Sequence, residues 1–149
     1  NTEPYKESIQ NTGAVVMGKN TFTMAEDPEW YIDYEFQVPI FVLTHTIPNQ
    51  QPKPTEKVSF TFVLDGVESA IKQAKLAAGI KDVAVIGSAN VTRQCIRAGL
   101  VDELQIDIMP ILLGGGLRLF EGSEASSIQL ERLNVVNLPG GRIHMKFRV

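Results

Sequence analysis

Short apolar runs that stop at a glycine or a turn residue constrain this chain more than any other feature of its sequence. Such runs cover residues 13–18, 38–44, 58–64, 83–86 and 104–113, the last interrupted by Pro110. Each is long enough for a strand and too short to cross a membrane as a helix. Between them, residues 67–77 and 89–98 carry apolar side chains at helical spacing, and Gly79 and Gly99 follow as stop signals. This alternation predicts an α/β fold in which helices flank a mostly parallel sheet.

The two ends of the chain depart from this simple alternation. Residues 128–149 predict two antiparallel strands joined by a turn at 138–141, which would add an antiparallel C-terminal hairpin to the sheet. Residues 3–10 predict a helix ahead of the first strand, although an α/β sheet usually opens with a strand. We therefore expect one domain over residues 1–149 that is N-terminally incomplete, with a strand ahead of residue 1.

Composition limits the classes of function that the chain can perform. The 149 residues carry a formal net charge of −3, and 44% of them are hydrophobic, which describes one globular domain. A mildly acidic chain without a long Lys/Arg run is not expected to bind nucleic acid or a membrane surface. The single cysteine, Cys95, excludes an internal disulfide framework and fits a reducing cytoplasm. We expect a cytoplasmic enzyme or ligand-binding domain.

Gly18, Lys19, Asn20 and Thr21 follow the first apolar run and predict a turn into a short helix. With Gly13, the Gly-Lys pair has the spacing of a nucleotide P-loop. However, the residues between the glycines are strand-like, and Asn20 stands where a Ser or Thr would hold magnesium. Backbone N–H groups at a helix start, with the Lys19 ammonium beside them, suit phosphate oxygens. A plain strand-to-helix turn is the alternative.

A second glycine turn, GSAN at residues 87–90, follows the run at 83–86. Small residues there let the backbone approach a pyrophosphate, although a tight connection without a ligand has the same pattern. Two such turns in one small domain favour a ligand with several phosphates. Thr44 and His45, where another run ends, would offer a hydroxyl and an imidazole to a further phosphate, unless they merely begin an exposed loop.

Few side chains suggest acid–base or metal chemistry. Asp107 lies in an apolar stretch, where a carboxylate is either part of a site or on the exposed face of a strand. His45 and His144 have no ligands at metal-binding spacing, so we expect no metal site. Cys95 lies in an apolar helix and is expected to be a core residue. Residues 27–36 interleave acids with aromatics, either over a cleft or around a packed aromatic cluster.

Four blocks of sequence resemble the dihydrofolate reductase-like family, which includes the reductase half of the riboflavin-biosynthesis deaminase–reductase. They are residues 13–22 (GAVVMGKNTF), 38–46 (VPIFVLTHT), 83–90 (VAVIGSAN) and 99–120 (GLVDELQIDIMPILLGGGLRLF). The last block is highly specific, and the order and spacing hold over nearly the whole chain. The chain looks most like the stand-alone bacterial members of that family.

The resemblance implies a dihydrofolate reductase-like fold with NADPH as its cofactor. By position, Gly18, Lys19, Asn20 and Thr21 match the family's Gly-Arg-x-Thr turn at the cofactor phosphates, and Thr44 and His45 lie where the adenosine 2′-phosphate is held. The family's pyrophosphate turn falls on Gly87, Ser88, Ala89, Asn90, Val91 and Thr92. Asp107 aligns with a strand position that faces the substrate, and we expect it to be catalytic.

The activity implied is hydride transfer from NADPH to a pteridine- or ribosylaminopyrimidine-type small molecule. The enzyme would act like a 5-amino-6-(5-phosphoribosylamino)uracil reductase or a dihydrofolate reductase, as a homodimer. Three residues depart from the family pattern: Lys19 replaces an Arg, Ser88 replaces a glycine, and Ile86 replaces a substrate-binding Glu of the riboflavin-pathway reductases. The alternative is a dinucleotide-binding module that kept the fold and lost the chemistry.

Overall fold

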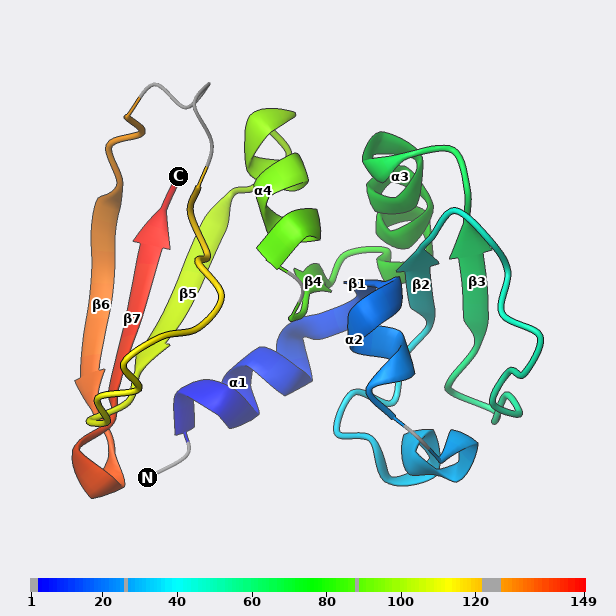
Figure 1. The fold of residues 1–149 in the computed structure, drawn as a ribbon, viewed down its shortest axis with the longest axis horizontal. Helices are drawn as coiled ribbons and strands as arrows, with labels where there is room; N and C mark the ends of the chain where they lie inside the picture. Colours follow the sequence, from blue (N-terminus) through cyan, green and yellow to red (C-terminus); the bar gives the residue numbers. More distant parts are fainter. Residues whose placement is uncertain (1–2, 26, 88, 122–126) are drawn as a thin grey trace.

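The computed structural model describes residues 3–25, 27–87, 89–121 and 127–149, which form an α/β fold with two separate sheets (Figure 1). Sheet A is parallel, with the order β3-β2-β1-β4, and sheet B is antiparallel, with the order β5-β7-β6. The strands of sheet A are β1 (Thr12–Gly18), β2 (Ile40–Leu43), β3 (Phe60–Val63) and β4 (Asp82–Val85). Those of sheet B are β5 (Glu103–Ile108), β6 (Glu131–Asn137) and β7 (Ile143–Arg148).

The helices confirm the flanked α/β arrangement that the apolar pattern predicts. The α-helices are α1 (Glu3–Asn11), α2 (Lys19–Thr23), α3 (Val67–Ala78) and α4 (Ala89–Arg97), and the 3-10 helices are η1 (Pro28–Asp33) and η2 (Pro139–Gly141). Helices α3 and α4 pack on one face of sheet A, while α2 and η1 pack on the other. Among the described residues, no helix combines the length and the apolar character that crossing a membrane requires.

Strand β1 forms the centre of the core because its apolar residues face both ways. Ala14 and Val16 lie in one apolar cluster, and Val15 and Met17 lie in the other. The first cluster is completed by the apolar stripe of α3 and by Val91 and Cys95 of α4. Full burial of one aliphatic side chain stabilises a fold by roughly 1.5–3 kcal/mol, so this two-sided burial is a large contribution. It also fixes β1 between β2 and β4.

The second cluster contains the aromatic residues that the sequence places among acids. Tyr31, Tyr34 and Phe36 are buried, and Phe22 of α2 stacks on Tyr31 with ring centroids 5.6 Å apart. The Tyr31 hydroxyl donates a hydrogen bond to the Phe22 carbonyl (3.1 Å), and burial raises the pKa of Tyr31 to about 12. Residues 27–36 are therefore an aromatic cluster with acids on its outside, which is the second of the two sequence interpretations.

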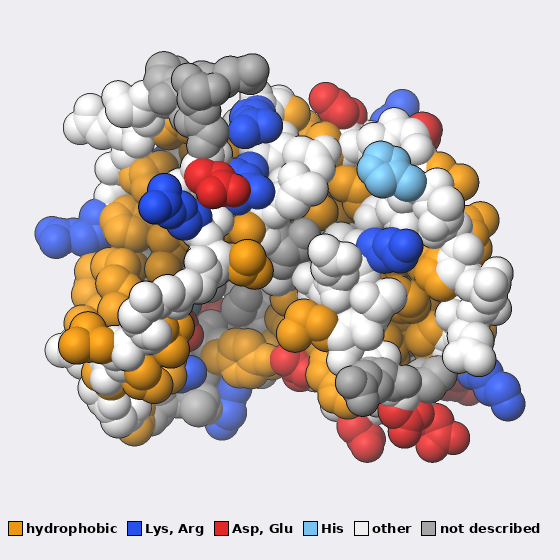
Figure 2. All heavy atoms as spheres, viewed as in Figure 1, with side chains coloured by type: hydrophobic (Ala, Val, Ile, Leu, Met, Phe, Trp, Pro, Cys, Tyr) orange, Lys and Arg blue, Asp and Glu red, His pale blue; other side chains and the backbone are white. Residues whose placement is uncertain are grey.

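The largest difference from the sequence-based expectation concerns the segment after residue 103. β5 ends at Ile108 because Pro110 lacks a backbone N–H and cannot continue a ladder. The hairpin of β6 and β7 pairs with β5 and forms its own sheet, whereas we expected it to add an antiparallel edge to the parallel sheet. Figure 2 shows hydrophobic side chains gathered over sheet B, where Ile111, Leu112 and Leu113 are exposed.

Gly13 lies where β1 comes close to the end of α3, so substituting it tests the packing between these two elements. A Cβ on Gly13 would lie 2.8 Å from the Lys81 Cβ and 2.9 Å from the backbone of Ala78. Gly13→Ala is therefore expected to lower the free energy of unfolding by about 1–3 kcal/mol, because backbone cannot move aside cheaply. Gly115→Ala is the matched control, since a Cβ there meets nothing within 4 Å and should change stability by less than about 0.5 kcal/mol. Equal losses in urea unfolding would contradict this account.

Candidate active site

The chain reverses its direction of progress across sheet A between β3 and β4. It moves from β1 outward to β2 and β3, and then returns through α3 to β4 on the other side of β1. The carboxyl ends of β1 and β4 therefore lie side by side. β1 leads into α2 and β4 into α4, and these helices cover opposite faces of the sheet. In open α/β sheets, a crevice for ligands forms at the carboxyl ends of the strands at such a reversal.

The two glycine turns predicted from the sequence meet at this point. Gly87, after β4, has φ +65°, and a Cβ on it would lie 2.7 Å from the Thr21 Oγ1 in α2. The backbone of one turn thus rests directly on a side chain of the other. Gly87 has to be glycine for two reasons, its left-handed backbone and its contact with Thr21. The structure therefore brings Thr21 and Gly87 together.

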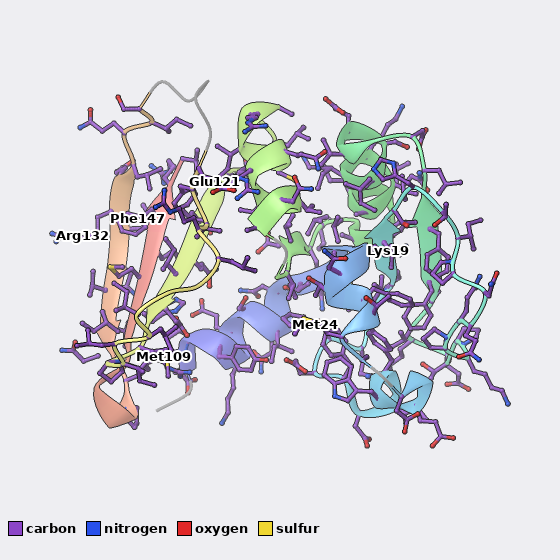
Figure 3. All side chains as sticks on the ribbon, in the orientation of Figure 1. Lys19, Met24, Met109, Glu121, Arg132 and Phe147 are labelled. Atoms are coloured by element: carbon purple, nitrogen blue, oxygen red, sulfur yellow. The ribbon has the colours of Figure 1, made fainter. Side chains whose placement is uncertain are left out.

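The first turn presents both backbone donors and a cation. Gly18 is the buried residue before α2, with extended backbone, and no side chain caps the helix start. Lys19 and Asn20 are the first two residues of α2 and are exposed. Figure 3 shows Lys19 where β1 passes into α2. An uncapped helix start beside an ammonium group is a suitable environment for an anion.

The second turn leads into α4, which is anchored by its buried face. Val91 and Cys95 lie in the core, so Val91 can contribute only backbone groups to a ligand. Asn90 is exposed and accepts a bond from the Gln94 Nε2 (3.4 Å). The Thr92 hydroxyl donates to the Gly87 carbonyl (3.5 Å), which closes the turn. Ala89 is half-buried at the first position of α4, and Ser88 lies outside the described residues.

Thr44 and His45 lie on the same edge of the sheet, one strand further along. Leu43 pairs with Gly18, so the end of β2 is level with the first glycine turn. Thr44 is buried, and its hydroxyl donates to the Thr46 carbonyl (2.8 Å). This hydroxyl therefore holds its own turn together in the structure. His45 is exposed, so its imidazole is the group at this position that can reach a ligand.

Asp107 is not brought together with the two glycine turns. It lies in β5 of sheet B, and Figure 3 shows the nearby Met109 at the far end of that sheet from Lys19. Its carboxylate is 2.6 Å from the His144 Nδ1 and 3.7 Å from the Arg142 Nη1, with the Asp107 side chain 41% exposed. In this structure it is therefore part of a cross-strand cluster on the polar face of sheet B. Its catalytic role stays a prediction.

Sequence reasoning missed the partners of Asp107 and the contacts of one cation in α4, Arg93. His144 lies directly opposite Asp107 in the β5–β7 register, a relation that appears only once the strand register is known. Arg93 of α4 donates to the Arg118 carbonyl (3.0 Å) and lies 3.7 Å from the Glu121 carboxylate. It therefore links Arg118 and Glu121 to α4. Its position in an amphipathic helix gave no signal of this.

Cys95 lies in the core, as its place in an apolar helix predicts. Cys95 is 1% exposed, and burial raises the pKa of its thiol to about 11, with the charge of Glu68 adding to the shift. The thiolate is the reactive form of cysteine, so the raised pKa disfavours reaction at Cys95. This cysteine therefore serves as a core residue. Within the described ranges, no group of three or more His, Cys, Asp or Glu residues could hold a metal ion.

The contact between the two turns can be tested by a matched pair of alanine variants. Gly87 and Gly99 both have left-handed backbone, at φ +65° and +68°, but a Cβ on Gly99 meets nothing within 4 Å. Gly87→Ala should therefore cost about 1–3 kcal/mol more in unfolding free energy than Gly99→Ala. Adding Thr21→Ala to Gly87→Ala should recover most of that excess. Equal costs for the two glycines would show that the turns do not touch.

Comparison with known proteins agrees with this fold. The family model of the RibD C-terminal domain matches residues 6–143. A structure of a putative riboflavin biosynthesis protein from Shewanella sp. PV-4 superposes with a TM-score of 0.76 at 24% identity, covering 97% of this chain and 78% of that one. Acinetobacter baumannii RibD in its form 2 gives a TM-score of 0.66 at 17% identity, covering 97% and 49%.

A third similar structure is the diaminohydroxyphosphoribosylaminopyrimidine deaminase/5-amino-6-(5-phosphoribosylamino)uracil reductase of Thermotoga maritima. It has a TM-score of 0.64 at 13% identity, covering 99% of this chain and 49% of that one. The chain thus spans about half the length of the Acinetobacter and Thermotoga proteins. No curated protein matches the sequence significantly. At these identities the structures show a shared fold, and the family model, which matches nearly the whole chain, shows that the protein belongs to the RibD C-terminal domain family.

Proposed function

We propose that this chain is an NADPH-dependent reductase that transfers a hydride to a pteridine- or ribosylaminopyrimidine-type small molecule. The observation that carries the proposal is the contact of the Gly87 turn with Thr21. This contact lies at the carboxyl ends of β1 and β4, where the strand order of sheet A reverses. Membership of the RibD C-terminal domain family supports the reaction class. The Thermotoga relative, which bears the name of a uracil reductase, supports the substrate class.

The residues at the two turns fit a dinucleotide cofactor. Gly87 is exposed, so its backbone can be approached from solvent, whereas the side where a Cβ would stand is filled by Thr21. Lys19 is exposed at the start of α2 and would pair with a phosphate, while His45 would reach another at the end of β2. The N-terminal backbone donors of α4 would bind the pyrophosphate. When bound, the nicotinamide ring would supply the hydride, and the protein would hold it against the substrate.

A dinucleotide-binding module without catalytic activity is the second candidate. Of the described residues, Asp107 is the acid that we predict to be catalytic, and the structure holds it in sheet B. Binding of NADPH, measured by fluorescence titration, combined with its oxidation by dihydrofolate, a ribosylaminopyrimidine or a quinoid pterin would support the reductase. Binding without oxidation by any of the three would favour the module, and absence of binding would exclude both.

Cofactor preference tests the assignment of Lys19. The wild-type chain is expected to bind NADPH more tightly than NADH, and Lys19→Ala should weaken NADPH binding about tenfold, or ~1.4 kcal/mol, with a smaller effect on NADH. The control is Lys75→Ala, which removes the same charge from the last turn of α3. That turn leads into β4 and so lies at the amino ends of the strands, away from the two glycine turns. Fluorescence titration gives the dissociation constants. Equal affinity of the wild type for the two cofactors would refute this assignment.

A pair of variants can separate a catalytic role of Asp107 from its role in cross-strand ion pairs. Asp107→Asn keeps the shape and removes the charge, so a catalytic role predicts turnover lowered by about a hundredfold with NADPH affinity unchanged. Glu103→Gln is the matched control, because Glu103 lies on the same face of β5 and pairs with Lys146 at 3.2 Å. If both variants lose stability alike and keep their turnover, Asp107 is a cross-strand salt-bridge residue and nothing more.

A further inference from the structure

His144 of β7 and Asp107 of β5 form an imidazole–carboxylate pair in which one ring nitrogen is unused. The Asp107 Oδ1 lies 2.6 Å from the His144 Nδ1, and the two residues are directly opposite in the strand register. A carboxylate at Nδ1 holds a proton on that nitrogen, which leaves Nε2 to accept or donate another. Within the described residues, the bond to Asp107 is the one hydrogen bond of this imidazole.

The imidazole is more sheltered than the other charged groups of sheet B. The His144 side chain is 12% exposed, whereas those of Lys146 and Glu103 are 36% and 44% exposed. In the described part of the chain, the side-chain atom that is sealed from solvent without a partner is the Arg142 Nε, so the His144 Nε2 is not sealed. A sheltered ring with one open, unbonded nitrogen suits proton transfer to a ligand.

Asp107, by contrast, already has both of its oxygens engaged. Its Oδ1 bonds His144, and its Oδ2 lies 3.7 Å from the Arg142 Nη1. Of the two members of the pair, His144 is therefore the one with a free hydrogen-bonding atom. The unpartnered Nε of Arg142 is a further unused donor in the same cluster. A cluster that served only to hold two strands together would be expected to satisfy this donor, since buried groups without a partner are exceptional.

The proposed cofactor contacts are ordered across sheet A toward this pair. His45 follows β2, Lys19 follows β1 and Gly87 follows β4, and the strands lie in the order β2-β1-β4. Figure 1 shows sheet B beyond β4, on the side away from β2 and β3. The pyrophosphate of a dinucleotide lies between its adenosine and its nicotinamide riboside. With the adenosine phosphate at His45 and the pyrophosphate at Gly87, the nicotinamide end would therefore point toward sheet B.

We propose that His144 is the proton donor of the reduction, that it acts through Nε2, and that Asp107 positions it. The inference rests on the proposed reductase function. The carbon of a substrate C=N or C=O bond receives the hydride with its electron pair, and the π electrons of that bond move to the nitrogen or oxygen. This atom takes the proton from Nε2 of the protonated imidazole, which becomes neutral and regains a proton from solvent. The substrate thus gains the two electrons that NADPH loses as it becomes NADP⁺.

The turnover of matched variants tests the proposal. With whichever of dihydrofolate, a ribosylaminopyrimidine and a quinoid pterin oxidises NADPH, His144→Gln should lower kcat about a hundredfold and leave the NADPH dissociation constant within about twofold. Imidazole added to His144→Gly should raise kcat at least about tenfold, because it can carry the same proton. Lys146→Gln is the matched control, since Lys146 lies on the same face of β7 and pairs with Glu103 at 3.2 Å. Its kcat should stay within about twofold of the wild type.

Nuclear magnetic resonance of the two imidazoles gives a readout that does not depend on turnover. His45 and His144 are the two histidines of the chain, so ¹⁵N-labelled histidine gives two sets of signals, which the His144→Gln spectrum assigns. Nδ1 of His144 should carry a proton, and Asp107→Ala should remove that preference. When each of the three compounds is added to the chain with NADP⁺, which holds no hydride to transfer, the substrate should shift the Nε2 signal of His144. The signals of His45 should not move at that addition.

Two results would overturn the role of His144 while the reductase function stands. A kcat of His144→Gln equal to that of Lys146→Gln would show that the pair only holds β5 and β7 together. An Nε2 signal that none of the three compounds moves would show that the substrate binds elsewhere. Failure of the reductase function is seen separately, because the wild-type chain would then oxidise NADPH with none of the three compounds. His144 would have no reduction to serve, and the proposal would fall with it.

Discussion

Burial of β1 on both faces is the constraint on which the rest of the structure depends. A strand that is apolar on both sides has to lie inside a sheet with covering layers above and below it. One layer is formed by α3 and α4, and the other by α2, η1 and their aromatic side chains. Because β2 and β4 flank β1 in parallel, the loops that follow β1, β2 and β4 gather at one edge. The candidate site is a geometric consequence of that packing.

The sequence predicts this half of the molecule well because its signals are local. A glycine after an apolar run marks a turn, and the carboxyl ends of neighbouring parallel strands meet without any knowledge of register. The contact of Gly87 with Thr21 needs one more fact, that β4 is the neighbour of β1, which only the structure gives. Side chains are harder to predict even here: the Thr44 hydroxyl donates to the Thr46 carbonyl in its own turn, a bond that the sequence does not indicate.

Sheet B was harder to predict because its features depend on strand register and on single backbone groups. Pro110 ends β5 earlier than the apolar pattern suggests, and His144 reaches Asp107 only through the pairing of β5 with β7. Its polar face is a ladder of exposed pairs, including Glu103 with Lys146 and Glu131 with Arg148. Exposed ion pairs contribute roughly 0–1 kcal/mol each, so they fix the register of the strands more than they stabilise the sheet.

The proposed cofactor side and substrate side of the candidate site therefore differ in the groups that would form them. The proposed cofactor side presents mainly backbone groups, namely an uncapped helix start at Gly18 and the glycine turn at Gly87, so binding there would depend less on any single side chain. A substrate site, by contrast, needs particular side chains at fixed distances. Ile86, directly after β4, packs in the aromatic cluster, where it offers apolar contact and no charge. Any recognition of a substrate by Ile86 would therefore rest on apolar contact and shape.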